Sequence, residues 1–260
     1  MLKGKAAIVT GSTSGIGLGI ARALAQTGCN VMLNGLGDPV EIEQIRNRLA
    51  EETGVEVAFS GADMIDPQAI AGMIDAAIDA FGRIDILVNN AGIQHVAPLE
   101  QFPAAKWDAI LAINLSSAFH AAKAVLPLMR ANGWGRIVNI ASAHGLVASP
   151  FKSAYVAAKH GLVGLTKVIA LETAEQAITC NAICPGYVRT PLVEKQIAEH
   201  AQAHGIPRES VIRDILLAAQ PNKAFVEVDQ LGALVVFLCG DAAASLTGAA
   251  LPVDGGWTAQ

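Results

Sequence analysis

Charged residues are scarce in this sequence, and basic residues are the scarcer kind. Charged side chains form 16% of the 260 residues, and 23 acidic against 18 basic side chains leave a formal net charge of -5. Such a chain has no broad positive field to attract nucleic acid or an anionic membrane, and no local basic cluster takes its place. We therefore expect neither as a partner.

Long hydrophobic runs are also lacking. The longest apolar run with a helical pattern, Leu231–Cys239, falls well short of the roughly 18 residues that a membrane span needs. The N-terminal segment holds too short an apolar stretch for a secretory signal, and its run Ala6–Val9 is typical of a strand. The sequence therefore predicts a cytoplasmic protein.

Cysteines and metal-ligand patterns are few. The cysteines lie in apolar segments without Cys-x-x-Cys spacing, which favours reduced core thiols over a disulfide framework or a zinc site. His200 and His204 have helical spacing, but the residues between them lack the glutamate of a zinc protease helix, and no third ligand is evident. We expect no metal. The four cysteines are Cys29, Cys180, Cys184 and Cys239.

Apolar residues, by contrast, are abundant and regularly arranged. At 52% hydrophobic, and with no linker rich in Pro, Gly or Ser, the chain is expected to form one domain over residues 1–260. Short β-branched runs alternate with longer amphipathic segments, which predicts an α/β fold with a Rossmann-type, doubly wound parallel sheet in three layers. The expected strands are Ala6–Val9, Asn30–Leu33, Val55–Phe59, Ile84–Val88, Arg136–Ile140 and Thr179–Ile183.

One region interrupts this alternation. Between about residues 187 and 225 no strand is expected, and two candidate helices, Leu192–His204 and Pro207–Ala219, occupy the interval. Insertions beyond the carboxyl end of a strand commonly cover a ligand site. The sequence therefore predicts a helical lid.

A glycine-rich loop follows the first strand and opens a helix. Its glycines are Gly11, Gly15 and Gly17. In that position a loop without side chains lets the backbone approach a pyrophosphate, and the helix N-terminus offers unpaired N–H groups and a partial positive charge. The alternative is a turn that binds nothing. The strand before it and the helix after it favour a dinucleotide site.

Tyr155 and Lys159 form a second candidate site. They lie four residues apart in Ser153–Lys167, a segment with helical spacing, so both side chains project from one face. A free tyrosine has a pKa near 10, and lowering it by about two units requires about 2.7 kcal/mol of preference for the anion. A nearby ammonium and a cationic cofactor ring can supply this preference. Individually, the two residues could also be a core aromatic and a solvated lysine.

Together, the motifs resemble the short-chain dehydrogenase/reductase family over essentially the whole chain. The resemblance implies that hydride moves between a secondary alcohol and a nicotinamide cofactor, while Tyr155 exchanges the alcohol proton and Ser142 donates a hydrogen bond to the same oxygen. It also implies that Lys159 binds the nicotinamide ribose and that Asn114 links it to solvent through ordered water. The motifs are Thr10–Gly17, Asn89–Gly92, Asn114, Ser142, Tyr155, Lys159, Pro185 and Gly186.

The resemblance extends to the cofactor contacts, with Asp63 at the adenine. The end of the second strand, Asn34–Asp38, has no basic residue to hold the extra phosphate of NADP, so we expect NAD. Asp38 could touch the ribose or cap the helix that begins near Pro39. The expected cofactor-binding residues are Gly11, Thr13, Gly15, Ile16, Gly17, Leu36, Asp63, Asn90, Ala91, Gly92, Tyr155, Lys159, Pro185, Gly186, Val188 and Thr190.

The substrate end contains an ammonium and several hydrogen-bonding side chains. Lys152 stands three residues before Tyr155, and His144 alternates with Ser142, so both are expected near the reacting centre. Such groups suit a short carboxylate, although each could also be a solvated surface residue. The surrounding segments resemble bacterial D-3-hydroxybutyrate dehydrogenases, which implies that D-3-hydroxybutyrate and acetoacetate are interconverted. The residues implied to bind substrate are Gln94, Ser142, His144, Lys152, Tyr155, Tyr187, Gln196 and Trp257.

Tyr187 departs from that pattern, because these enzymes usually have tryptophan there. The change leaves space, adds a hydroxyl and concerns pocket size rather than proton transfer. Two other functions compete: reduction of a bulkier or carrier-bound 3-oxo substrate with NADPH, and a non-catalytic dinucleotide-binding regulator. The resemblance further suggests a homotetramer.

Overall fold

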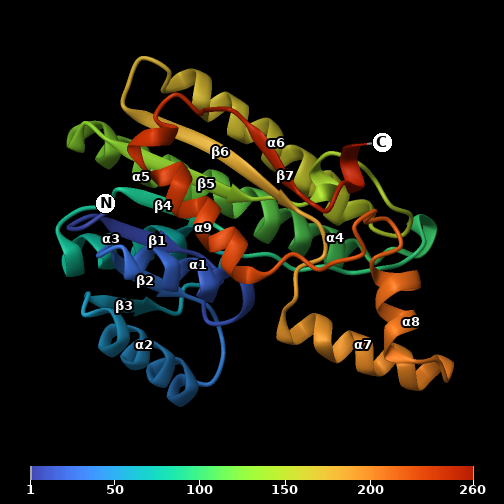
Figure 1. Cartoon of the computed structure of the whole chain (residues 1–260). Helices are drawn as coiled ribbons and strands as arrows, with labels where there is room; N and C mark the ends of the chain where they lie inside the picture. Colours follow the sequence, from blue (N-terminus) through green and yellow to red (C-terminus); the bar gives the residue numbers. More distant parts are fainter. Residues whose placement is uncertain (1, 260) are drawn as a thin grey trace.

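A computed structural model describes residues 2–259 of the chain. The side chains of six residues are outside this description: Leu192, Gln196, Glu199, His200, Ala203 and His204. One parallel sheet runs through the structure in the order β3-β2-β1-β4-β5-β6-β7 (Figure 1). Its strands are β1 (Ala6–Val9), β2 (Asn30–Asn34), β3 (Val57–Ser60), β4 (Ile86–Asn89), β5 (Gly135–Ile140), β6 (Ile178–Pro185) and β7 (Ala250–Val253).

Helices cover both faces of the sheet. On one face α1 (Gly15–Gln26), α2 (Pro39–Thr53) and α9 (Val228–Cys239) enclose one apolar core. On the other, α3 (Pro67–Phe81), α5 (Ser117–Asn132) and α6 (Ser153–Glu172) enclose a second core, and α4 (Ala104–Leu111) packs against α6. Neighbouring strand residues alternate between the cores, as Ile8 and Val9 do. This three-layer arrangement confirms the predicted fold class.

The predicted strands are all present, with shifted ends, but a seventh strand was missed. β7 is the edge strand beside β6, and its Pro252 lies opposite Cys184. Proline cannot donate to a strand ladder and is tolerated at a sheet edge, so the segment lacks the β-branched pattern that identified the other strands.

The lid region contains α7 (Pro191–His204), the short helix α8 (Arg208–Ser210) and a π-helical turn, Val211–Leu216. These elements project from the sheet beside the strand ends (Figure 1). They surround a small apolar cluster that includes Ile197 and Val211. The second predicted helix, Pro207–Ala219, is thus too long, because its regular hydrogen bonding gives way to a wider turn in which the Leu217 N–H donates to the Ile212 carbonyl.

Two helical stretches, Ala104–Asn132 and α6, are long and apolar enough to cross a membrane. Both stretches include charged residues, so neither is an uninterrupted apolar run like Leu231–Cys239. Val125 of α5 and Ile169 of α6 are buried in the core between helices and sheet. Both stretches are therefore helices that cover the sheet.

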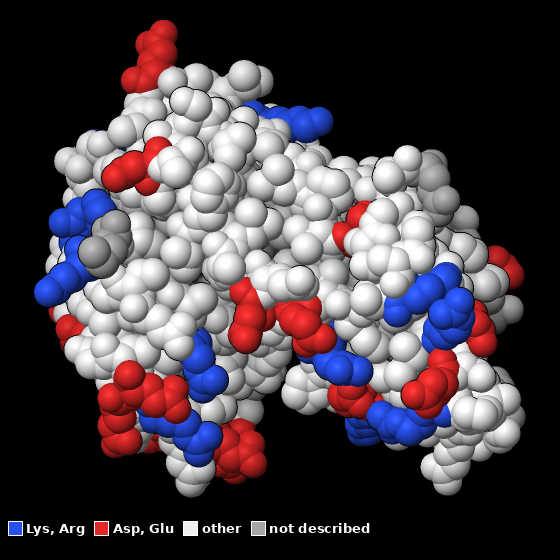
Figure 2. Space-filling view, in the orientation of Figure 1, with Lys and Arg blue, Asp and Glu red and all other residues white. Residues whose placement is uncertain are grey.

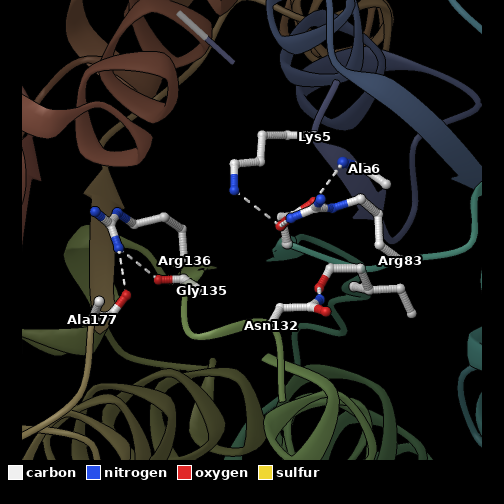
Figure 3. A network of polar contacts seen from close by, with 9 residues as sticks. Lys5, Ala6, Arg83, Asn132, Gly135, Arg136 and Ala177 are labelled. Atoms are coloured by element: carbon white, nitrogen blue, oxygen red, sulfur yellow. Dashed lines mark hydrogen bonds and ion pairs between the residues drawn. The ribbon is translucent and has the colours of Figure 1, made fainter. Parts of the chain in front are cut away.

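An ionic network ties strands together at the amino ends of the sheet (Figure 3). Arg83 and Lys5 both contact the fully buried carboxylate of Asp85, which also accepts the backbone N–H of Ala6. Burial alone raises the pKa of Asp85, but these hydrogen bonds hold it below its ordinary value. The network fixes β1 against the segment that enters β4.

Charge elsewhere is dispersed. On the face in Figure 2, lysines and arginines lie among aspartates and glutamates around a largely uncharged centre, and a notch separates the lobe of α2 from that of α7 and α8.

The four cysteines are free and buried, as predicted.

Candidate active site

A cleft of about 880 Å³ opens at the carboxyl ends of the strands. Parallel α/β sheets place ligands at this edge, where the loops after the strands meet. Every residue expected to contact the cofactor lines it, from Gly11 after β1 to Thr190 before α7. The lid contributes Val193, Ile215 and Leu216.

The glycine loop packs so closely against its neighbours that side chains would not fit at two of its glycines. Gly11 has φ +60°, and a Cβ there would lie 2.9 Å from the Cα of Ala91; a Cβ on Gly17 would collide with the Gly11 carbonyl. The N-cap residue of α1, Ser14, makes no side-chain capping bond, so the first-turn N–H groups are left for a ligand. These residues fit the pyrophosphate of a dinucleotide.

Side chains from neighbouring strands hold this loop. The Asn90 amide donates to the carbonyls of Thr10 and Gly11, both at 2.9 Å, and the Thr10 hydroxyl accepts the N–H groups of Asn90 and Ala91. Asn34, fully buried at the end of β2, accepts the N–H of Gly11. Asn90, which was expected to contact the cofactor, therefore supports the loop.

The adenosine end of the cleft carries no basic side chain among the described residues. Asp38 caps α2 by accepting the N–H groups of Val40 and Glu41, and it does not line the cleft. The capping alternative for Asp38 is therefore correct. Leu36 and Asp63 line this end. Lys152 and Lys159 are the cleft's only lysines or arginines in the described part of the chain, and they lie near Tyr187 and Tyr155, respectively.

Ser142, Tyr155 and Lys159 meet at the middle of the cleft. Ser142 follows β5, while Tyr155 and Lys159 project from the first turns of α6. The Lys159 Nζ lies 5.6 Å from the centre of the Tyr155 ring and donates to the carbonyl of Ile140 at 2.7 Å. The predicted catalytic trio is thus assembled around one point.

Burial dominates the ionisation of this trio. It raises the pKa of Tyr155, although the hydrogen bond from Ser142 acts in the opposite direction. It also lowers the pKa of Lys159 to about 8. The protein groups alone therefore do not lower the pKa of Tyr155, and the lowering that we expect from Lys159 together with a cationic nicotinamide stays a prediction.

Aromatic rings wall the substrate end. Trp257 stacks on Tyr187 with ring centres 6.1 Å apart and meets His144 edge-on at 5.0 Å. The Lys152 ammonium lies 5.9 Å from the centre of the Tyr187 ring, and burial lowers its pKa. Gln94 lines the same cleft. The side chain of Gln196, also expected here, lies outside the described residues.

Asn114 is the predicted catalytic residue that does not line the cleft. It sits in a π-helical turn, Ala112–Ser116, between α4 and α5, and its amide exchanges two 2.9 Å hydrogen bonds with the backbone of Ile93. Its side chain therefore supports the segment between Gly92 and Gln94. The expectation that Asn114 links Lys159 to solvent through ordered water remains a prediction.

Three supporting residues were missed. Gln220 is fully buried and accepts the N–H of Tyr187, while Asp254 accepts the N–H groups of Gly256 and Thr258 and so orients the segment that bears Trp257. Ser149 contacts His144. No local pattern marks Gln220 or Ser149, because their roles depend on tertiary contacts. Among the described residues no cluster of three potential metal ligands occurs, and the side chains of His200 and His204 lie outside them.

Comparison with known proteins places this architecture in a family. The family model described as enoyl-(acyl carrier protein) reductase matches residues 11–258. The chain is 56% identical over 256 residues to a D-beta-hydroxybutyrate dehydrogenase of Rhizobium meliloti (strain 1021), covering 98% of this chain and 99% of that protein. A D-beta-hydroxybutyrate dehydrogenase of Cupriavidus necator is 56% identical over 261 residues, with both chains fully covered.

Solved structures agree. A putative short-chain alcohol dehydrogenase from Sinorhizobium meliloti 1021 superposes with a TM-score of 0.88 at 37% identity, covering 100% of this chain and 98% of that one. A single-residue variant of actinorhodin polyketide ketoreductase with NADPH gives 0.90 at 34% identity, with 98% of each chain covered. The glycine loop, the Ser142–Tyr155–Lys159 centre and these full-length matches lead to one conclusion: the chain belongs to the short-chain dehydrogenase/reductase family.

Proposed function

We propose that this protein is an NAD-dependent dehydrogenase that interconverts D-3-hydroxybutyrate and acetoacetate. The observation that carries the proposal is the convergence of Ser142, Tyr155 and Lys159 with a further, half-buried ammonium, Lys152, in one cleft beyond the glycine loop. The full-length identity of 56% to two D-beta-hydroxybutyrate dehydrogenases supports it.

The protein groups handle the proton while the cofactor handles the hydride. When bound, NAD supplies a nicotinamide ring that accepts hydride from the substrate's C3. Tyr155 takes the proton of the alcohol as a general base and returns it in the reverse direction. Ser142 donates a hydrogen bond to the same oxygen, which stabilises developing negative charge. The Lys159 ammonium favours the phenolate of Tyr155 through its positive charge.

Other residues would bind and orient the dinucleotide. The α1 N-terminus and the loop of Gly11, Gly15 and Gly17 would hold the pyrophosphate. Asp63 would lie at the adenine and Lys159 at the nicotinamide ribose. Thr13, Ile16, Leu36, Asn90, Ala91, Gly92, Pro185, Gly186, Val188 and Thr190 line the rest of the path. Asn114, which lies behind the residues that line the cleft, would connect Lys159 to solvent through ordered water.

The carboxylate of the substrate would lie against Lys152 and Gln94, because a buried anion needs both a counter-charge and hydrogen bonds. Gln196 is proposed to reach it from the lid. His144 lines the same end of the cleft. Tyr187 and Trp257 would close the pocket around the methyl end and so limit the length of the acid.

Reduction of a 3-oxo substrate with NADPH is the nearest competing function. The structural relative solved with NADPH is a ketoreductase. An extra phosphate at the adenosine end would require a cation, and the described residues that line that end include none. This arrangement favours NAD and a small acid.

Absorbance of NADH tests the proposal. Purified protein is mixed with D- or L-3-hydroxybutyrate, each with NAD⁺ or NADP⁺, and the methyl ester of the D isomer serves as a substrate without charge. We expect turnover of the D acid with NAD⁺, at least tenfold slower reaction with NADP⁺ and a clearly higher KM for the ester. Equal use of the L isomer, or a preference for NADP⁺, contradicts the proposal.

We also propose that the protein is a cytoplasmic homotetramer. The helices α5 and α6 expose large apolar side chains, namely Phe119, Val168 and Leu171, and exposed apolar groups of this kind are typical of contacts between subunits. Light scattering on the purified protein measures the assembled mass directly, and a monomeric mass would refute the tetramer.

A further inference from the structure

The backbone of Tyr187 is held by the chain that returns from the lid to α9, residues 220–226. Its N–H donates to the side-chain Oε1 of Gln220, and its carbonyl accepts the N–H of Val226 at 2.9 Å. Val226 also forms a parallel bridge with Val188. Both hydrogen-bonding groups of the Tyr187 backbone are therefore satisfied by this return segment, which fixes where the Tyr187 ring enters the cleft.

The side chain of Gln220 fills the space beside Gly186. It is fully buried, its Oε1 accepts from Tyr187, and its Nε2 donates to the carbonyl of Ala224 at 2.8 Å. A Cβ on Gly186 would collide with the same Oε1, so the amide occupies room that only a glycine leaves at the end of β6. Gln220 does not line the cleft. Any influence on a ligand therefore passes through the neighbours that do, Gly186 and Tyr187.

The return segment also contacts the chain that bears Trp257. The N–H of Asn222 donates to the carbonyl of Gly255 at 3.2 Å, and a Cβ on Gly255 would collide with the side chain of Asn222. Trp257 in turn stacks on Tyr187, with ring planes 5° apart. The chains that carry these two rings are thus both hydrogen-bonded to one short segment, so the position of that segment sets how the rings meet.

We propose that Gln220 determines the chain length of the 3-hydroxy acid that the protein accepts, by holding Tyr187 in its stack against Trp257. The inference rests on the proposed dehydrogenase function, in which these two rings close the pocket around the methyl end of the substrate. Gln220 is then a positioning residue, because it acts on the substrate only through Tyr187. One methylene in a fitted apolar pocket changes kcat/KM by roughly 10- to 200-fold, so a displaced ring is measurable as a changed length preference.

Gln220→Met tests this role, because methionine has a similar length but neither hydrogen-bonding group of the amide. The measured quantity is the ratio of kcat/KM for D-3-hydroxybutyrate to that for D-3-hydroxypentanoate, which is one carbon longer at the methyl end. We expect the ratio to fall at least about fivefold. The fall should come chiefly from KM, because the groups that transfer the proton are untouched. An unchanged ratio, or a fall carried wholly by kcat, overturns the proposal.

Two further variants provide the controls. Lys223 lies in the same segment, and its ammonium donates to the carbonyls of Leu217 and Ala218, at 2.9 and 2.7 Å, rather than to Tyr187. Lys223→Met should loosen the base of the lid and leave the ratio within about twofold of its original value. Gln220→Glu keeps an oxygen that accepts from Tyr187 and should also keep the ratio within about twofold. An equal fall in all three variants would mean general loosening of the lid and overturns the proposal.

A double-mutant cycle with Tyr187→Ala shows whether Gln220 acts through the ring. In the background without the ring, Gln220→Met should change the ratio by less than about twofold, and an undiminished effect there overturns the proposal. Gln220→Asn, whose shorter side chain withdraws the amide from Tyr187, replaces Gln220→Met if the latter does not fold. Turnover of D-3-hydroxybutyrate by the unaltered protein reports on the proposed function separately. Its absence overturns both, whereas an unchanged ratio beside that turnover refutes this inference alone.

Discussion

Tyr155→Phe should lower kcat for oxidation of D-3-hydroxybutyrate by about 10²- to 10⁴-fold, the range that a positioned general acid–base contributes. The phenol lies in the cleft with Ser142 and Lys159, and it is the group to which we assign transfer of the alcohol proton. The variant keeps the ring that packs against His144. Binding of NAD, followed by nucleotide fluorescence, should therefore survive.

A hydroxyl on the same helix provides the control for this variant. The Oγ of Ser153, two residues earlier in α6, is buried without a hydrogen-bond partner and does not line the cleft. Ser153→Ala should keep kcat within about twofold, because no hydrogen bond is lost. Substantial turnover by Tyr155→Phe would show that another group transfers the proton.

Lys159→Met should abolish efficient turnover and yet stabilise the protein. The pKa of this fully buried lysine falls from its ordinary 10.5 to about 8, chiefly through burial. Such a difference corresponds to a cost of about 3 kcal/mol for keeping the ammonium in the fold. Loss of its hydrogen bond to the Ile140 carbonyl offsets about 1 kcal/mol. We expect a net gain of about 2 kcal/mol in the free energy of unfolding at pH 7 without cofactor.

The pH dependence of that gain follows from the direction of the shift. Below pH 8 the lysine is charged in both the folded and the unfolded state, so burial exerts its whole cost. Between pH 8 and 10.5 the folded protein releases the proton first, the cost shrinks, and the advantage of methionine narrows. Urea unfolding of Lys159→Met, with the exposed Lys167→Met on the same helix as control, measures this. A variant less stable at pH 7, or an advantage that grows toward pH 10, contradicts the burial argument.

The sequence was informative about the fold wherever a local pattern recorded it. Ala6–Val9 and the helix after the glycine loop were recognised because strands and amphipathic helices have regularly spaced apolar residues. The loop between them was recognised by its glycines. The edge strand with Pro252 left no such trace. The turn Val211–Leu216 was assigned as ordinary helix, since its apolar spacing does not distinguish a wider turn from an α-helix.

Site residues were likewise predictable where local spacing identifies them, and not where their roles depend on the tertiary fold. The spacing of Tyr155 and Lys159 on one helix is local information, so their convergence was predictable. The ambiguity at Asp38 was resolved only by its bonds to Val40 and Glu41, and the contribution of Ser149 only by the fold of the segment after Ser142. The raised pKa of Tyr155 in the protein alone was not foreseeable from spacing, because burial depends on the whole fold and outweighs the hydrogen bond from Ser142.

Direct transfer of hydride from the substrate carbon is the most decisive test. Protein, NAD⁺ and D-3-hydroxybutyrate deuterated at C3 are incubated together, and the mass of the NADH formed is measured by mass spectrometry. If Tyr155 removes the hydroxyl proton while C3 gives up its hydride, the NADH formed carries one deuterium and the product is acetoacetate. Unlabelled NADH, or no NADH at all, would contradict the assignment of this cleft to alcohol oxidation.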